Sequence, residues 1–441
     1  MALWHRGSFV GSFPIRHKGY FALLLIFTLL AGLPFLLLQV SHASHVAGYE
    51  VWVLDQSDTV AEGGGTLHIY DGWGFGGKGY RGNTEVINFA DRASGIGDGV
   101  GKRPHMVFFN SEQTHAIISN VVSGHIYFMD ADSKEILSSI RMGKDGDEMR
   151  GAHAAMPAPD SSMVIVTNHK KLEKIHTDYA NNEYSYNPDD AINLAEMEDE
   201  THPDNWIVCP IFTTDSRYVF ATLRGGGLYV IDVKSSPMEI VASFDNGQVG
   251  PNGCGGVTNE EGSKMYINSG GGTAKHPLGS DIYTFDLSGF SADAPTVSEP
   301  EHILAREGFV DSHGMLLTKN DRYLWTTDRA ANLIEIIDTT TNEVINQIDL
   351  TKGSDDFDPA PDLIFASPHR SGAFTALRGP SPLSGNAPDV NNAAGNSPGL
   401  GVVKMSLDGK TGTLLYVVPI SHVVDGKEMA DPHGIAVREL V

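Results

Sequence analysis

The chain has 441 residues, an ordinary apolar content of 41%, 49 glycines and a formal net charge of -24 at pH 7. This length suits two or three average domains or one large repeat domain, and the apolar content argues against a disordered protein. We expect no nucleic-acid partner, because the chain is acidic and has no stripe rich in lysine and arginine.

The N-terminus carries a leader-like segment. Three basic residues precede an uncharged run at 20–40, and small residues follow it up to Ala43. This pattern predicts an export signal over 1–43, cleaved after Ala43. The run is also long enough to span a bilayer, so an uncleaved membrane anchor is the alternative. Both place the body of the chain outside the cytoplasm, in the periplasm or its equivalent, because the positive flank stays inside.

Short phrases typical of strands recur along the rest of the chain. Each is an aromatic and β-branched run opened by a turn residue and usually closed by aspartate, which favours a strand between two turns. The phrases are GTLHIYD at 65–71, GHIYFMD at 124–130, KLEKIHTD at 171–178, GGLYVID at 226–232, SDIYTFD at 280–286, NLIEIID at 332–338 and GLGVVKM at 399–405.

Each phrase belongs to a longer unit. A polar turn and an alternating strand precede most of them, as in TKNDRYLWTT at 318–327, and another strand follows, as in EVINQIDL at 343–350. Four strands per unit, repeated seven times, predict an all-β chain folded as one seven-bladed β-propeller over 49–441. The first unit lacks its first strand, and HGIAV at 433–437 has no followers, so the two chain ends are expected to complete one blade and close the ring.

The repeat resembles a known family. The segments at 313–350 and 225–236, the second reading GGGLYVIDVKSS, are similar to the YVTN-type β-propeller repeats of exported and surface-layer proteins, which are distant relatives of WD-type repeats. The resemblance covers roughly residues 49–441. It implies the fold and leaves the function open, because propellers host many chemistries.

Three segments depart from the unit. They are a glycine- and aromatic-rich stretch at 71–83, a polar acidic stretch at 177–205 and a low-complexity stretch at 385–399. Insertions in repeat proteins form loops, often on a binding face, so they are candidate contacts for a protein partner. The alternative is that they are loops that merely tolerate sequence drift.

One aligned position carries the candidate chemistry. His313 lies nine residues before Arg322 in the second strand of its unit, and the same alignment selects one residue in every other unit. The position reads His105, His153, Val208 or Cys209, Cys254, His313, Asp362 and His433. First strands line the central channel of a propeller, and equivalent residues point the same way, so these side chains are expected around one channel mouth.

These residue types predict a transition-metal site. Imidazole binds zinc, copper, iron and nickel, and thiolate favours copper or zinc, so copper or zinc is the expected cofactor. The predicted ligands are His105, His153, His313, His433 and Cys254, with Asp362 as a further ligand or the catalytic base. The alternative is structural, because a histidine here can simply bond the next blade. No HExxH or CxxC motif supports the metal.

Several neighbouring features stay open. Asp311 and Asp431, each two residues before a predicted histidine ligand, are expected to orient those rings. Cys209 and Cys254 are the only cysteines and lie in adjacent units, where a disulfide, metal ligation and free thiols are all compatible with the sequence.

The sequence therefore predicts an exported metal-binding propeller that acts on a small molecule at the channel mouth as a metal-dependent oxidoreductase. Methanethiol oxidase-like proteins, which are exported propellers with a histidine-lined copper site, provide the analogy. A non-catalytic metal carrier and a protein-interaction propeller are the alternatives, and the sequence leaves open whether the protein is an enzyme.

Overall fold

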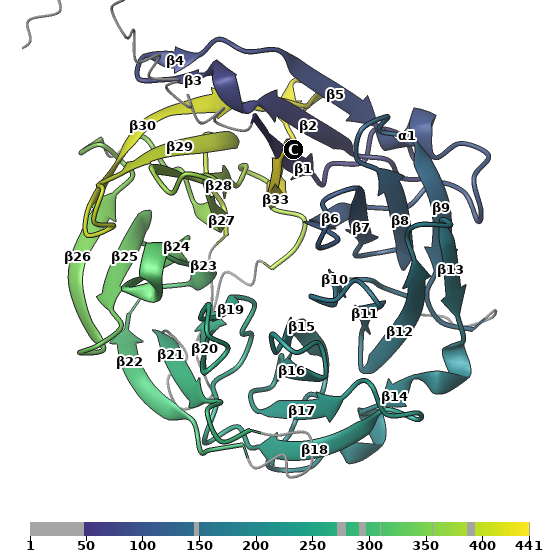
Figure 1. The fold of residues 1–441 in the computed structure, drawn as a ribbon. Helices are drawn as coiled ribbons and strands as arrows, with labels where there is room; N and C mark the ends of the chain where they lie inside the picture. The colour runs from purple at the N-terminus through teal and green to yellow at the C-terminus, as the bar shows by residue number, and fades with distance from the viewer. Residues whose placement is uncertain are drawn as a thin grey trace, which may run out of the picture. The chain divides into compact units, whose positions relative to one another are not determined.

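Seven antiparallel β-sheets surround a common axis in the computed structural model, which describes residues 48–144, 150–270, 279–290, 297–308, 310–354, 356–385 and 393–440 (Figure 1). This confirms the predicted seven-bladed propeller. Contacts divide the chain into Met1–Val46 and Ala47–Val441, and the leader predicted over 1–43 lies outside the described residues. Within the described part of the chain, no helix is long and apolar enough to cross a membrane.

Each blade runs from an inner strand at the axis to an outer strand at the rim. Blade 1 consists of β6 (Pro104–Phe109), β7 (His115–Asn120), β8 (His125–Asp130) and β9 (Ile136–Arg141). Blade 2 consists of β10 (Ala155–Pro157), β11 (Met163–Asn168), β12 (Lys171–Asp178) and β13 (Glu183–Tyr186), with β14 (Ile192–Asn193) also paired to β12. Blade 3 consists of β15 (Ile207–Phe212), β16 (Tyr218–Leu223), β17 (Leu228–Asp232) and β18 (Glu239–Phe244).

The next three blades repeat this order. Blade 4 consists of β19 (Gly256–Thr258), β20 (Lys264–Gly270), β21 (Gly279–Asp286) and β22 (Glu301–Glu307). Blade 5 consists of β23 (Ser312–Leu317), β24 (Tyr323–Asp328), β25 (Leu333–Asp338) and β26 (Glu343–Asp349). Blade 6 consists of β27 (Pro361–Ala366), β28 (Gly372–Leu377), β29 (Gly399–Met405) and β30 (Gly412–Pro419).

Blade 7 joins the two ends of the propeller, as the sequence predicted. Its order is β33 (Pro432–Glu439), β1 (Tyr49–Asp55), β2 (Thr66–Asp71) and β5 (Thr84–Asn88). The C-terminal strand is innermost and pairs antiparallel with the N-terminal one, with Trp52 opposite Ala436. The ring is thereby closed through backbone hydrogen bonds, which protects the edges that both strands would otherwise expose.

Short elements lie between the blade strands, some inside one blade and some between two. They are the hairpins β3 (Phe75–Gly76) with β4 (Gly79–Tyr80) and β31 (Val423–Val424) with β32 (Lys427–Glu428), the helix α1 (Phe89–Arg92), and the 3-10 turns η1 (Gly72–Gly74), η2 (Pro188–Asp190), η3 (Ala195–Met197) and η4 (Lys319–Asp321).

A recurring backbone feature explains why the polar phrases are turns. In blades 1 to 6, the residue two positions before the second strand has a positive φ, between 50° and 69°. These residues are Gln113, Ser161, Ser216, Gly262, Asp321 and Arg370. Most side chains disfavour this left-handed region of φ, and only one of the six residues is glycine. The tight reversal between the two strands therefore imposes the conformation on whichever residue stands there.

The hydrophobic core lies between neighbouring blades. Apolar residues of β11, β12, β15, β16 and β17, for example, form one cluster across blades 2 and 3, including the buried Ile165, Leu172 and Val219. Alternating side chains on each strand face opposite neighbours, so every blade contributes to two such layers. Burial of a large apolar side chain stabilises the fold by about 1.5–3 kcal/mol.

The predicted insertions have separate outcomes. The stretch at 177–205 is not only a loop, since it supplies β13, the outer strand of blade 2, and also β14. Tyr186 in β13 anchors it by donating a hydrogen bond to the buried Glu173 (2.8 Å). The stretch at 71–83 forms the β3–β4 hairpin. In the stretch at 385–399, residues 386–392 lie outside the described part.

Candidate metal centre

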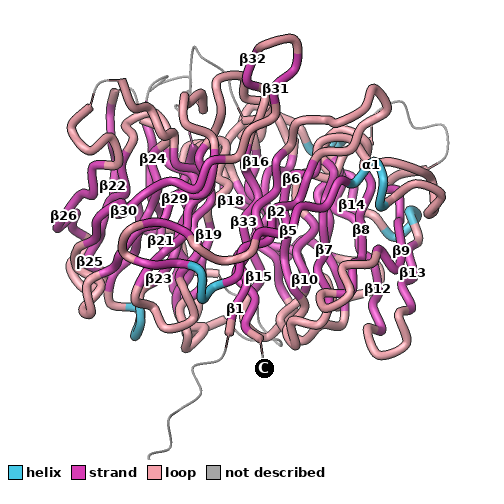
Figure 2. Tube along the Cα trace, turned by 90° about the horizontal axis from the view of Figure 1, so that it is seen from above, coloured by secondary structure: helices cyan, strands magenta, loops and turns pink. Residues whose placement is uncertain are grey.

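The inner strands of all seven blades begin at one face of the propeller. Figure 2 shows the β31–β32 hairpin projecting from one face and the chain end at the other, and β33 begins directly after that hairpin. Each inner strand contributes one side chain, at or just before its start, to a ring around the axis. The ring consists of His105, His153, Cys209, Cys254, His313, Asp362 and His433.

β-Bulges account for the position of five ring members. The pairing of inner and second strands shifts register between Pro104 and Met106, and equivalent shifts flank Cys209, His313, Asp362 and His433. A bulge releases one residue from the ladder and changes the direction of its side chain. The alternation of a regular strand therefore fails at this position, and Cys209 rather than Val208 enters the ring.

Polar side chains on the second strands hold the inner strands in place. Ser119, Thr167, Thr222, Asn268 and Thr327 each accept a hydrogen bond from a backbone N–H in, or one residue before, the inner strand of their own blade. Thr327 Oγ1 also donates to the carbonyl of Asp362 in the next blade (2.6 Å), and Asn268 donates to that of His313 (2.7 Å). The ring backbone is thus fixed from both sides.

Three imidazoles lie side by side in the ring. The rings of His105 and His433 stack with centroids 3.8 Å apart, and those of His105 and His153 meet edge-on at 4.4 Å. His433 Nδ1 donates to the carbonyl of His105 (3.1 Å), since a carbonyl only accepts. The Nε2 of His433 is therefore the nitrogen directed to Asp362, 3.8 Å from Oδ1.

The sulfur atoms of the ring adjoin His153. Cys209 and Cys254 are free thiols with their Sγ atoms 2.8 Å apart, and together with His153 they bring three donor atoms within 4.8 Å of one another. The hydrogen bond from Cys209 and the neighbouring His313 and His153 hold the pKa of Cys254 well below its usual range. Burial and the Cys254 thiolate raise that of Cys209.

The other half of the ring is a carboxylate between two imidazoles. His313, Asp362 and His433 also bring three donor atoms within 4.8 Å of one another. His313 Nε2 is 3.0 Å from Asp362 Oδ1, but the two are not aligned as a hydrogen bond. Burial works to raise the pKa of Asp362, yet His313 and the guanidinium groups of Arg329 and Arg378 hold it well below the usual range.

Buried atoms of the ring lack partners in a way that fits a metal ion. The unpartnered atoms are His105 Nε2, His153 Nδ1, both ring nitrogens of His313 and Asp362 Oδ1. Each unsatisfied buried polar group costs about 1–3 kcal/mol. Burial also lowers the pKa values of His105, His153 and His433, which keeps these imidazoles neutral and able to bind a cation.

The expected role of the two aspartates is wrong. Asp311 binds Arg329 through two hydrogen bonds (2.8 and 3.0 Å), and Asp431 binds Arg378 in the same way (2.6 and 2.8 Å). Neither carboxylate bonds a histidine. Arg378 Nη1 instead reaches Asp362 Oδ2 (2.6 Å), so the aspartates position the ring through arginine, which the repeat alignment gave no reason to expect.

Gln56 takes the orienting role at His105. Its Nε2 donates to Asp431 Oδ2 (3.0 Å), which leaves Oε1 to accept from His105 Nδ1 (2.7 Å). The His105 Nε2 lone pair therefore faces the ring, as is usual for a metal-binding histidine whose second nitrogen is held by a neighbour. Gln56 follows the last residue of β1, and its position next to His105 depends on ring closure.

A loop covers the mouth of the channel. In the segment 378–385 between β28 and β29, Leu383 N donates to Asp431 Oδ2 (2.7 Å) and Ser384 Oγ donates to Gln56 Oε1 (2.9 Å). Under it His105 and His433 are each 1% exposed, and Asp362 is 0% exposed. His153 is the ring member that stays partly accessible.

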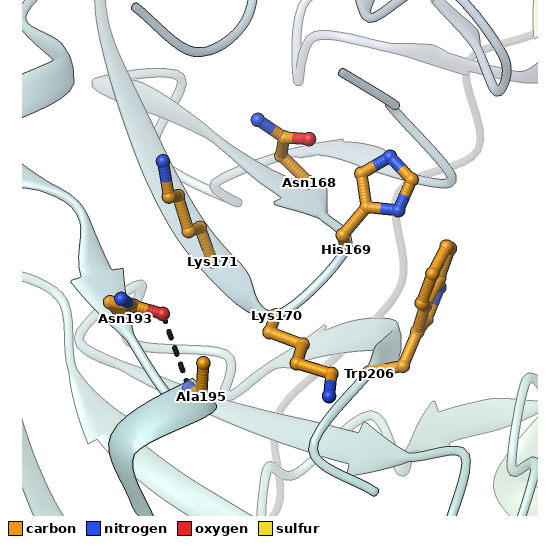
Figure 3. Close-up of a pocket in the computed structure, with 7 residues that line it drawn as sticks. All are labelled: Asn168, His169, Lys170, Lys171, Asn193, Ala195 and Trp206. Atoms are coloured by element: carbon orange, nitrogen blue, oxygen red, sulfur yellow. Dashed lines mark hydrogen bonds between the residues drawn. The ribbon is translucent and has the colours of Figure 1, made fainter. Parts of the chain in front are cut away.

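An open pocket lies away from the ring. Figure 3 shows it at the β11–β12 turn, beside His169 and Trp206. Its volume is about 260 Å³. No ring residue lines it, and both ring nitrogens of His169 lack a hydrogen-bond partner, whereas other polar groups of its lining are engaged. Asn193 accepts from the Ala195 N–H (3.1 Å), for example, and Lys170 pairs with Glu198 (2.6 Å). The donor chemistry is concentrated in the ring.

Four further histidines of the described residues lie outside the ring. His115, His125 and His176 lie in second or third strands, and His369 lies in the turn before β28. The ring therefore gathers every predicted site residue and adds Cys209, which had been left as one of two choices. Arg329, Arg378 and Gln56 had no sequence signal, because their partners are distant in the chain and, for Arg378–Asp431 and Gln56–His105, lie in different blades.

Comparisons with known proteins bear on the fold. No protein-family model and no curated protein matches this chain, so the expected YVTN membership has no support from a family model. The chain is similar to a crystal structure of a protein from Lactobacillus plantarum, with a TM-score of 0.59 and 11% identity over 89% of this chain and 100% of the other.

Two further solved structures resemble it. The periplasmic gluconolactonase PpgL of Pseudomonas aeruginosa has a TM-score of 0.56 and 12% identity, over 90% of this chain and 100% of the other. The Cps50 (Swd1) β-propeller domain of Myceliophteria thermophila has a TM-score of 0.51 and 11% identity, over 71% and 86%. At these identities the likeness shows the propeller fold and leaves activity open.

Proposed function

We propose that this protein is an exported β-propeller that binds a transition metal, copper or zinc, within the ring of channel side chains. The observation that carries the proposal is the set of buried, unpartnered donor atoms on His105, His153, His313 and Asp362. Two cysteines next to these imidazoles favour a soft ion such as copper(I) or zinc.

The proposed activity is a metal-dependent oxidation or reduction of a small molecule. The bound ion would supply the redox or Lewis-acid chemistry. The protein would hold the ion in a dry, preorganised site, with His153 at the accessible side and Asp362 as ligand or base. A non-catalytic metal-binding role is the second candidate, and it is favoured by the loop 378–385, which covers the mouth.

Elemental analysis of protein purified without an affinity tag tests the metal. We expect a stoichiometric metal in the wild type and its loss in the double variant His153→Gln, His313→Gln. The matched control is His176→Gln with His369→Gln, which changes two exposed histidines and should keep the metal. Absence of metal from the wild type under every loading condition would overturn the proposal.

Two further measurements separate the remaining parts. Reversible loss of a copper(II) electron paramagnetic resonance signal on reduction, together with turnover of a small molecule, supports the enzyme. A metal that binds without changing oxidation state or supporting turnover favours the non-catalytic role. N-terminal sequencing of exported protein, with Ser44 expected first, tests the leader.

A further inference from the structure

The ring borders a buried cluster of charges that does not balance. Arg329 pairs with Asp311, and Arg378 pairs with Asp431, each through two hydrogen bonds. These pairs use one negative charge for each positive charge. Asp362 contacts both arginines, at 3.6 Å and 2.6 Å, yet it is the third carboxylate beside two guanidinium groups. Two guanidinium groups and three carboxylates leave one negative charge without an arginine of its own, and the groups beside its free oxygen are the imidazoles of His313 and His433.

That charge is completely buried. Asp362 is 0% exposed, and its Oδ1 has no hydrogen-bond partner, because the arginines approach Oδ2. An uncompensated buried carboxylate is expensive, and buried charges in native proteins are paired or coordinate metals. His313 and His433 lie on the Oδ1 side of Asp362. This half of the ring therefore offers a cation one carboxylate oxygen and two imidazole nitrogens.

The adjoining part of the ring offers a different set of donors. His153, Cys209 and Cys254 provide one nitrogen and two sulfur atoms, and no carboxylate belongs to this group. Thiolate sulfur selects copper(I) or zinc, whereas two histidines with a carboxylate are typical of iron(II) and of catalytic zinc. The two groups also differ in exposure, since His153 is partly accessible while His313, Asp362 and His433 are all buried.

We infer that the ring holds two metal ions of different class. A soft ion binds at His153, Cys209 and Cys254 and exchanges with solvent, and a second ion binds at His313, Asp362 and His433 and is sealed inside the propeller. The inference rests on the proposed function, because it divides the same ring. Metal exchange, and contact between a metal and any small molecule, then take place at the accessible site of His153, Cys209 and Cys254.

Cobalt(II) is the probe that distinguishes the two sites. Reduced wild-type protein is loaded with excess Co²⁺, desalted and analysed for cobalt, and its near-ultraviolet spectrum is recorded for thiolate-to-cobalt charge transfer. We expect two cobalt ions per chain. Cys209→Ser should keep one ion without the charge-transfer band, and His433→Gln should keep one ion with the band.

Removal kinetics give a second readout. We expect EDTA to remove the ion that carries the charge-transfer band at least ten times faster than the other ion. Urea unfolding and circular dichroism check that each variant is folded. If Cys209→Ser does not fold, Cys254→Ser serves in its place, because it removes the other sulfur of the same group.

The outcomes separate the inference from the proposed function. One ion per wild-type chain, lost in both variants, would show a single mixed site and overturn the inference while the proposed metal site survives. Loss of both ions in either variant would also overturn the division, as would equal removal rates. A Cys209–Cys254 disulfide in the wild type, seen as a lack of free thiols, would eliminate the soft site. No bound metal at all would refute the proposed function itself.

Discussion

Replacement of Arg378 by methionine should destabilise the propeller more than any surface ion-pair change. The guanidinium donates two hydrogen bonds to Asp431, one to Asp362 and one to the carbonyl of Ser384 (2.6 to 2.9 Å). Arg378 and both carboxylates are 0% exposed. Methionine fills much of the volume, so the main effect is two buried carboxylates that lose their cation.

The expected loss is about 3–5 kcal/mol, the usual cost of removing one partner from a buried ion pair. Asp431 keeps hydrogen bonds from Gln56 and the N–H of Leu383, but the only guanidinium left to Asp362 is the more distant one of Arg329. Addition of Asp431→Asn to the variant should therefore recover part of the loss, because it removes one of the two unpaired charges.

Urea unfolding at neutral pH, followed by circular dichroism, measures the free energy of unfolding. Arg217→Met is the matched control, since Arg217 makes two hydrogen bonds to Asp232 from a side chain that is 35% exposed, and such pairs contribute about 0–1 kcal/mol. If Arg378→Met lowers the free energy of unfolding by less than about 1 kcal/mol, as the control does, the ion pairs of Arg378 with Asp431 and Asp362 are not the buried, charged pairs that the structure shows.

Three further outcomes are expected. Gln56→Leu should weaken metal binding about 10–100-fold, because His105 loses the acceptor that fixes its ring, and unchanged chelator competition relative to Gln248→Leu would contradict this. Thr327→Val should cost about 1–3 kcal/mol in urea unfolding, since it leaves a buried N–H and a buried carbonyl unpaired, and a neutral result would contradict the proposed bridging role. Burial lowers the pKa of His68 from 6.5 to about 4, so the imidazole is neutral in the folded and the unfolded chain above pH 6.5. As the pH falls from 6.5 toward 4, the unfolded chain binds a proton at this residue before the folded protein does, and up to about 3 kcal/mol of stability should be lost. The free energy of unfolding should therefore depend less steeply on pH in His68→Gln than in the wild type.

The local sequence determined the architecture. Strand phrases such as 332–338 are short aromatic or β-branched runs, and polar turns separate them, so the number and order of strands can be read without tertiary information. Blade closure was also readable, because a first strand without followers at 433–437 complements a unit without its first strand. Backbone pairing is local to each blade, which is why these inferences succeed.

The ring was partly readable for the same reason. A repeat places equivalent positions at equivalent angles, so His105 and Asp362 were selected together although 257 positions separate them in the sequence. The choice between Val208 and Cys209 was not readable, because a β-bulge breaks the alternation there.

Only the tertiary structure decided the surroundings of the ring. Gln56 meets His105 because the ring closes, and Arg378 meets Asp431 because blade 6 lies against blade 7. Such partners follow no sequence period, since they lie on different blades and their spacing depends on loop lengths. The sequence by itself thus determined which donors share a channel mouth, and the packing of blades decided which of them are oriented, charged and buried.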